Sequence, residues 1–414
     1  MLDFKMILIV GLVAMNIDEN VKNLLFELIR IPSIRGNEKP VIQLLYNRLL
    51  PLVDECHLVP MDNSIMNDPD YAFKLENFSY RDTCNLECII KGYGGGKSVL
   101  FNAHVDVVPV SAGQKDPFTP IMKDGFVFGR GACDDKGQIA ALYALVLFLK
   151  ESGLRPKGDL IFHFVVEEEN GGNGTLAMLR RGIKADAVIV VESSELNIIT
   201  AVRGAVWFNL EVFGKSGHSG SGDTVSALQE SVQAMAILRD YHDKVLRESR
   251  GNSLFDKFRD PMPITFGQLY AGDWPATTPA KAVLKGVFGF LPNKTRSEIQ
   301  EGMRGIIRAK GDAWLREHFN LSFPMLNLDG GIIDADHPLV LSLRKAVKKN
   351  NYPGDIAAMT AACDACLYHN LTKIPTVVFG PGAVKYAHTN EERIALKEIL
   401  SAGMILKDFV VSCY

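Results

Sequence analysis

His104 and Asp106 stand two residues apart in SVLFNAHVDVV, at the end of an apolar run that is typical of a core strand. In an extended chain, residues two apart project from the same face. A metal-binding imidazole commonly gives its second N–H to a carboxylate, and Asp106 is placed to be that partner of His104. Alone, the pair is better explained as an ordinary surface pair, so its weight depends on other residues.

Other acidic residues, and a second histidine, follow predicted turns or strands. FGRGACDDKG places Asp134 and Asp135 after a glycine-rich turn, where a carboxylate can cap the next helix or bind an ion. FHFVVEEENGGNG ends an apolar strand in three glutamates, 167–169, which repel one another when buried unless a cation or raised pKa values relieve them. Glu192 follows the apolar run VIVV directly, and His388 lies in FGPGAVKYAHTNE after another strand.

Each of these residues could be structural, but together they form a set of nitrogen and oxygen ligands without a thiolate. Such a set suits a hydrolytic pair of zinc, cobalt or manganese ions that shares one carboxylate. The predicted ligands are His104, Asp134, Glu169, Glu192 and His388.

The glycine-rich segment GYGGGKS is not a phosphate-binding loop. A Walker loop needs glycine five residues before the Gly-Lys pair and a helix after it. Here Lys91 takes the glycine's place and a strand follows, so a hairpin turn is predicted.

Alternating strands and helices predict an α/β fold with a mostly parallel sheet flanked by helices, whose site lies at the strand ends. The expected strands are 98–102, 160–166, 187–191 and 375–379, and the expected helices are 134–150, 339–349 and 391–409.

The pattern changes after Arg203 to that of an inserted two-layer α+β module. The boundaries are therefore predicted as 1–201 and 327–414 for the main domain and 202–326 for the insertion. Within the insertion we expect strands at 206–213, 264–269, 282–290 and 315–323, and helices at 224–238 and 295–309.

Composition favours a small-molecule or peptide substrate. The chain has 414 residues, 47% of them hydrophobic, and a net charge of -3, which gives no attraction to nucleic acid or anionic membranes. Seven scattered cysteines indicate free thiols and a cytoplasmic protein. The apolar run Met6 to Met15 is too short to span a membrane but leaves export open. Met15 is the expected functional start, because a cap and an amphipathic helix follow it.

In their order along the chain, the motifs resemble the metallopeptidase and deacylase family of acetylornithine deacetylase, succinyl-diaminopimelate desuccinylase, aminoacylase and carboxypeptidase G. The resemblance runs nearly end to end. The motifs that carry it are NAHVDVVP, DPFTPIMKDGFVFGRGACDDKG, EEENGGNGT, VES, GKSGHSG, GDWPATTPA, TAACDA, FGPG and AHTNE.

The resemblance implies a role for each candidate. Asp134 would bridge two metals, His104 and Glu192 would bind different ones, and Glu169 and His388 would complete the two spheres. Asp106 would orient His104, Glu168 would be the general base, and Asp135 would anchor a cis peptide.

His218, in GKSGHSG, matches a histidine that reaches into the partner's active site in dimeric relatives and stabilises the oxyanion. The resemblance therefore implies a homodimer through the inserted module, which is the lid of this family. In relatives, arginines near Gly289 and at the position of Cys366 bind the substrate carboxylate. These arginines are missing here, and Arg203 and Lys215 are candidate replacements.

We therefore predict a metal-dependent deacylase of N-acyl amino acids that uses two divalent ions, zinc before cobalt or manganese. A dipeptidase or carboxypeptidase of the same family, and a metal-binding relative without catalysis, remain alternatives. Serine hydrolase and HExxH patterns are absent, and C-x-x-C at Cys363 and Cys366 is better explained by buried thiols than by a redox or zinc site.

Overall fold

The computed structural model describes residues 16–73, 78–111 and 113–414. The apolar run Met6 to Met15 lies outside the described residues. The expected cap after it is present, because the Asn16 side chain accepts a hydrogen bond from the Asp18 N–H at the start of α2. None of the helices among the described residues has the length and apolar character needed to cross a bilayer.

The main sheet has the order β1-β2-β6-β3-β7-β18-β8-β16, with β17 paired to β8. Its centre, β6-β3-β7-β18, is parallel, and the strands towards the edges add antiparallel pairs. The carboxyl ends of the central strands therefore meet along one edge. The strands are β1 (Glu55–Pro60), β2 (Cys84–Ile90), β3 (Val99–His104), β6 (Leu160–Val165), β7 (Ala187–Val190), β8 (Ile198–Val202), β16 (Gly331–Ile332), β17 (Ile356–Met359) and β18 (Thr376–Val378).

The segment GYGGGKS is not a hairpin turn, contrary to the prediction. β2 and β3, which it joins, lie on opposite sides of β6 and pair with β6 rather than with each other.

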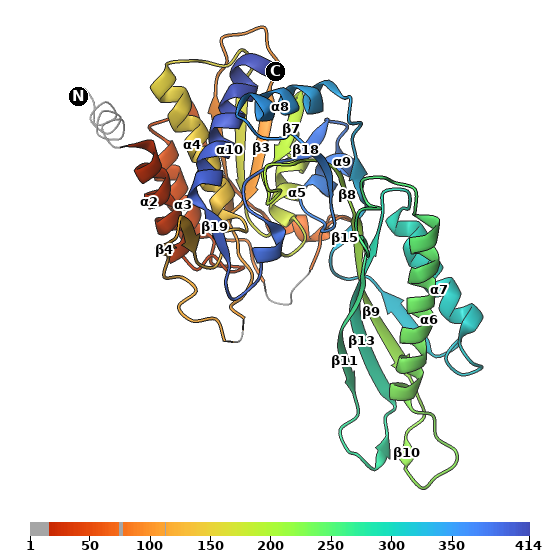
Figure 1. Cartoon of the computed structure of the whole chain (residues 1–414). Helices are drawn as coiled ribbons and strands as arrows, with labels where there is room; N and C mark the ends of the chain where they lie inside the picture. The colour runs from red at the N-terminus through yellow and green to blue at the C-terminus, as the bar shows by residue number, and fades with distance from the viewer. Residues whose placement is uncertain (1–15, 74–77, 112) are drawn as a thin grey trace.

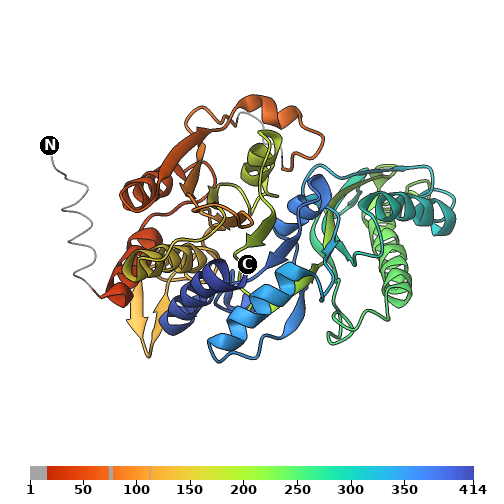
Figure 2. The ribbon, with the colours of Figure 1, turned by 90° about the horizontal axis from the view of Figure 1, so that it is seen from above.

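Helices cover both faces of this sheet (Figures 1 and 2). Buried aliphatic residues of α4 pack against α10, α2 and β3. The opposite face is covered by α5 and α9. The helical elements of the main domain are α2 (Ile17–Arg30), α3 (Lys39–Leu49), η1 (Asn63–Asn67), α4 (Lys136–Ser152), α5 (Asn173–Arg180), α8 (Pro338–Lys349), α9 (Ala365–Leu371), η2 (Val384–Tyr386), α10 (Leu396–Asp408) and η3 (Phe409–Cys413).

The last helix begins at Leu396, not at Glu391 as predicted. Arg393–Ala395 forms strand β19, which pairs with β5 (Phe126–Phe128), and β5 pairs with β4 (Ile121–Lys123). This small sheet brings the segment after His388 close to the segment before Asp134.

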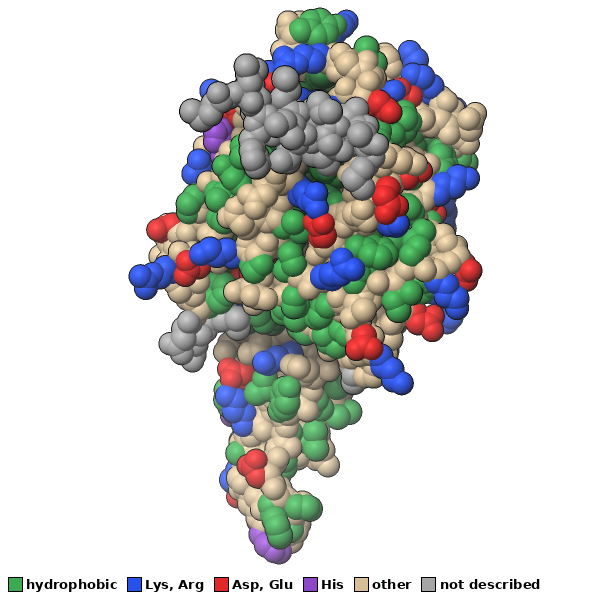
Figure 3. Space-filling model, turned by 90° about the vertical axis from the view of Figure 1, so that its left-hand side faces the viewer, with side chains coloured by type: hydrophobic (Ala, Val, Ile, Leu, Met, Phe, Trp, Pro, Cys, Tyr) green, Lys and Arg blue, Asp and Glu red, His purple; other side chains and the backbone are tan. Residues whose placement is uncertain are grey.

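The inserted module is a sheet with two helices on one face, and it projects from the main domain as a narrow arm (Figures 1 and 3). The sheet order is β11-β13-β9-β14, with β15 also paired to β9, and its core is separate from the main core. The arm contains β9 (Gly204–Phe213), β10 (Gly217–His218), α6 (Ala227–Glu248), β11 (Ile264–Ala271), β12 (Thr277–Thr278), β13 (Lys281–Phe290), α7 (Arg296–Lys310), β14 (Phe319–Ser322) and β15 (Asn327–Leu328). Below it is called the lid.

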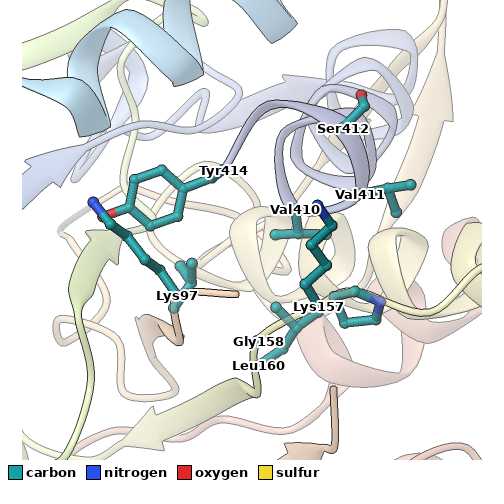
Figure 4. Close-up of a pocket in the computed structure, with 10 residues that line it drawn as sticks. Lys97, Lys157, Gly158, Leu160, Val410, Val411, Ser412 and Tyr414 are labelled. Atoms are coloured by element: carbon teal, nitrogen blue, oxygen red, sulfur yellow. The ribbon is translucent and has the colours of Figure 1, made fainter. Parts of the chain in front are cut away.

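The chain ends on the side of the main sheet opposite to the carboxyl ends of the central strands. There Tyr414 lies beside Lys97, whose Nζ is 4.9 Å from the ring centroid, and both line a pocket of about 180 Å³ with Val410 and Lys157 (Figure 4). Lys97 precedes β3, whereas His104 ends it, so this pocket is separate from the predicted site.

Candidate metal centre

His104 ends β3, the strand between β6 and β7, and is 1% exposed. Its backbone N–H donates to Oδ2 of Asp135 at 2.9 Å. The peptide bond between Asp134 and Asp135 is cis, as expected. The glycine-rich turn and the start of α4 therefore lie directly against the end of β3.

The structure brings all five predicted ligands together in two groups that share Asp134. One group holds His104, Asp134, Asp135 and Glu192, and the other holds Asp134, Glu169 and His388. His104 and Glu192 therefore lie in the same group, and the expectation that they bind different metals is wrong. The potential ligand atoms of each group lie within 4.8 Å of one another. Asp135 is an addition to the predicted set.

The Asp134 carboxylate lies between two imidazoles. His104 Nε2 is 2.9 Å from Oδ1 of Asp134, and His388 Nε2 is 3.1 Å from Oδ2. Glu169 Oε1 is 2.9 Å from His388 Nε2, and Glu192 Oε1 is 3.6 Å from His104 Nε2. Each side of this carboxylate thus has one histidine and one glutamate.

These acids are unfavourable together without cations. Burial and the neighbouring Asp134 carboxylate raise the pKa of Glu169 to about 7 and that of Glu192 to about 8. Burying several carboxylates costs several kcal/mol unless positive charge offsets it. Two divalent ions would supply that charge, and the nitrogen and oxygen donors suit zinc, cobalt or manganese, so the residues fit the predicted metal pair.

Asp106 holds the turn that carries two of the glutamates. Its Oδ1 and Oδ2 accept the backbone N–H groups of Glu168 and Glu169, each at 3.1 Å. His104 Nδ1 is 3.0 Å from the Asp106 carbonyl oxygen and 3.4 Å from its Oδ1. Asp106 therefore contacts the histidine, as predicted, and also fixes the β6 end, which was not predicted.

Glu168 lies beside the ligand groups but belongs to neither of them. Burial, together with the carboxylates of Asp364, Glu192 and Glu169, raises its pKa well above the ordinary glutamate value, although His104 opposes the shift. A raised pKa is what a general base needs to work near neutral pH.

Sequence reasoning missed Glu392, which fixes the Asp134 segment. Glu392 Oε1 accepts the backbone N–H groups of Cys133 and Asp134 at 3.0 and 3.1 Å. Its Oε2 accepts from Arg130 Nη1 at 2.7 Å, and both side chains are buried. In TNEER, Glu392 looks like a surface charge, and only the pairing of β19 with β5 brings it inside.

His218 does not join the ligand groups of its own chain. It lies in β10, which Figure 1 shows at the far end of the lid, and its side chain is exposed. The Gly220 N–H donates to its Nδ1 at 3.1 Å. The neutral ring therefore carries its proton on Nε2, where it can donate to another group.

Arg203 lies against both positions at which the resemblance implied an arginine. A β-carbon at Gly289 would overlap Nη1 of Arg203, and Cys366 Sγ is 3.6 Å from the Arg203 carbonyl oxygen. Nε donates to the Thr360 carbonyl, but the buried Nη1 has no hydrogen-bond partner among the residues that the structure describes. Burial lowers the pKa of this guanidinium. Lys215, the other candidate, is exposed and paired with Asp223.

The cysteines give no support to a thiolate metal site. Among the described residues, neither group of potential metal ligands includes a cysteine. Cys363 and Cys366 are free and buried, and burial raises the pKa of Cys366 to about 12.

Comparison with known proteins identifies similar chains. Residues 100–412 match the model of Peptidase family M20/M25/M40. An N-formyl-4-amino-5-aminomethyl-2-methylpyrimidine deformylase of Bacillus subtilis (strain 168) is 28% identical over 348 residues, with 76% of this chain and 79% of the relative covered. An acetylornithine deacetylase of Myxococcus xanthus is 28% identical over 339 residues, which cover 78% of this chain and 82% of the relative.

A solved tripeptidase of Staphylococcus aureus subsp. aureus Mu50 has a similar fold, with a TM-score of 0.75 and 17% identity. The match covers 95% of this chain and 97% of that protein. It supports the predicted combination of an α/β domain with a lid.

Proposed function

The chain belongs to peptidase family M20/M25/M40, and on this premise we propose that it is a metal-dependent hydrolase of the amide bond in N-acyl amino acids. The observation that carries the proposal is the pair of ligand groups that share Asp134. The deformylase and the deacetylase that match more than three quarters of the chain support an acyl substrate.

His104, Asp134 and Glu192 would hold one metal, and Asp134, Glu169 and His388 would hold the other. Zinc is the proposed metal in both places. The metals would supply Lewis-acid polarisation of the substrate carbonyl and a lowered pKa for a shared water. Asp106 and Glu392 keep the ligand segments in position through backbone N–H groups.

Glu168 takes the proton of the attacking water and later gives it to the leaving amine. The raised pKa of its buried side chain supports this role.

His218 of a second copy donates its Nε2–H to the oxyanion that forms at the substrate carbonyl. The exposed position of His218 at the far end of its own lid supports a site completed by another chain. The proposed dimer forms through the lid. The lid also exposes apolar side chains on an edge strand, β11, and on a helix, α6; they include Leu269, Tyr270, Leu228 and Val232.

Arg203 binds the substrate carboxylate in place of the missing arginines. A buried guanidinium nitrogen without a partner is costly, and an anionic ligand would offset that cost. The Thr360 carbonyl accepts a hydrogen bond from Nε of Arg203. Thr360 also lines a pocket of about 290 Å³, together with Ile199, Met359 and the lid residue Phe258. This mostly apolar pocket would take an apolar part of the substrate.

The protein is proposed to work in the cytoplasm. The six cysteines whose side chains are described are all free, which supports a reducing compartment.

A substrate panel tests the function. N-acetyl, N-succinyl and N-formyl amino acids are compared with dipeptides, first with a chelator and then with zinc, cobalt or manganese restored. The proposal expects acyl amino acids to be preferred, activity to disappear with the chelator and zinc to restore it best. Preference for dipeptides would favour the peptidase alternative, and inactivity on all substrates at full metal loading would favour a relative without catalysis.

A further inference from the structure

Two thiols face each other on the two outermost strands at one edge of the main sheet, away from the metal centre. Cys56 in β1 and Cys88 in β2 are directly opposite in the antiparallel register, and their Sγ atoms are 3.2 Å apart. β1 is the edge strand, and β2 and β6 separate it from β3, which carries His104. Three strand spacings amount to about 14 Å.

The backbone already has the geometry of a cross-strand disulfide. The Met61 N–H donates to the Thr83 carbonyl at 3.0 Å, and Met61 continues the register that pairs Pro60 with Cys84. Because hydrogen-bonded and non-hydrogen-bonded pairs alternate, Cys56 and Cys88 form a non-hydrogen-bonded pair, with Cα atoms about 4.5 Å apart. That separation lies within the range of about 4.4–6.8 Å seen across disulfides.

We propose that Cys56 and Cys88 are a redox modification site, where a disulfide forms when the protein meets a low-molecular-weight disulfide such as oxidised glutathione. The proposal is independent of the hydrolase activity, because neither thiol belongs to the ligand groups.

The two cysteines differ in a way that sets the order of the steps. Cys56 is half-buried and can be reached, whereas Cys88 is fully buried. The two sulfur atoms are within hydrogen-bond distance, and this contact lowers the pKa of Cys56 and raises that of Cys88.

The reaction is a balanced thiol–disulfide exchange. Cys56 loses its proton and attacks one sulfur of glutathione disulfide, so that a mixed disulfide forms and one glutathione leaves as a thiol. Cys88 then loses its proton and attacks the Cys56 sulfur, and the second glutathione leaves as a thiol. Two protein thiols are oxidised and one glutathione disulfide is reduced, with both protons taken up by the leaving thiolates.

Mass spectrometry of the tryptic digest tests the proposal on the full-length protein. After incubation with oxidised glutathione and blocking of free thiols, residues 49–74, which contain Cys56, should be linked to residues 82–91, which contain Cys84 and Cys88. Cys56→Ser should abolish the link. Cys84→Ser is the matched control and should keep it, because Cys84 lies opposite Pro60.

The linked protein should unfold a few degrees above the reduced protein, since the bond closes a long loop, and reduction should reverse the shift. Hydrolysis should be unchanged. Absence of the linked peptide, its loss in Cys84→Ser or its persistence in Cys56→Ser would each overturn the proposal.

Discussion

His388 Nε2 lies 3.1 Å from Oδ2 of Asp134, on the side of the carboxylate opposite to His104. Asp134→Asn removes one of these two oxygens. We expect the metal content to fall from about two ions per chain towards zero, because both ligand groups need this carboxylate. Glu192→Gln is the matched variant: it changes one group only and should retain about one ion. Metal analysis of the purified variants measures the ion content of each. Equal losses of metal in the two variants would contradict the shared role of Asp134.

Glu168→Gln keeps the shape of the side chain but removes the proposed base. We expect kcat to fall by about a hundredfold to ten-thousandfold while metal content stays the same. Steady-state kinetics and metal analysis check this, and Glu151→Gln on the exposed end of α4 is the control for the substitution itself. Unchanged turnover would remove Glu168 from the mechanism.

His218→Ala should lower kcat by about a hundredfold to a thousandfold without loss of metal, because it removes one donor to the oxyanion. The proposed dimer gives a sharper test. When His218→Ala and Glu168→Gln proteins are mixed and their subunits exchanged, one site of each mixed dimer has both groups, so about a quarter of the wild-type activity should return. If the mixture stays inactive although mixed dimers form, His218 does not act across the interface.

Arg203→Met tests the reading of the substrate carboxylate. The wild-type protein should prefer an N-acyl amino acid over the same compound with its carboxylate converted to an amide. The variant should lose most of that preference, by about tenfold or more in kcat/KM, because a charge-assisted contact is removed. Lys215→Met is the matched control. A variant that loses activity equally on both compounds would assign Arg203 a structural role only.

His369 predicts how stability depends on pH. It packs against Gly331, and burial lowers its pKa to about 4, whereas an unfolded histidine titrates near 6.5. As the pH falls, the unfolded chain therefore takes up this proton first, and stability is lost between about pH 6.5 and 4. The loss between pH 7 and 5 should be about 2 kcal/mol, and His369→Gln should reduce the pH dependence of denaturant unfolding. His57→Gln, at an exposed position, controls for the substitution, and an unchanged slope in His369→Gln would contradict the assignment.

The sequence indicated that the candidate ligands lie together because three of them follow apolar strands. His104, Glu169 and Glu192 each come just after a run that could only be a buried strand, and strands of one parallel sheet end together. The helix predicted for 295–309 is present at Arg296–Lys310, with Thr295 and Glu298 forming its capping box.

The contacts that hold the ligands in place could not be predicted in the same way. Glu392 and Arg130 are 262 positions apart in the chain, and nothing local distinguishes either of them from a surface charge. The same holds for the place of Arg203, because its contact with Gly289 depends on the pairing of β9, which follows Arg203, with β13. The boundaries of strands were predicted less accurately than their existence: β14 covers only Phe319–Ser322, inside the predicted 315–323.

Glu392, whose carboxylate accepts the backbone N–H of Asp134, lies 258 residues after Asp134 in the chain. During translation, the ribosome makes the lid and the greater part of the main domain before His388 and Glu392 exist. Until then the nascent polypeptide carries clustered acids without their second histidine and without the anchor of the Asp134 loop. Maturation of the centre is therefore a late event, and an amino-terminal fragment that stops within the lid would lack the means to complete it.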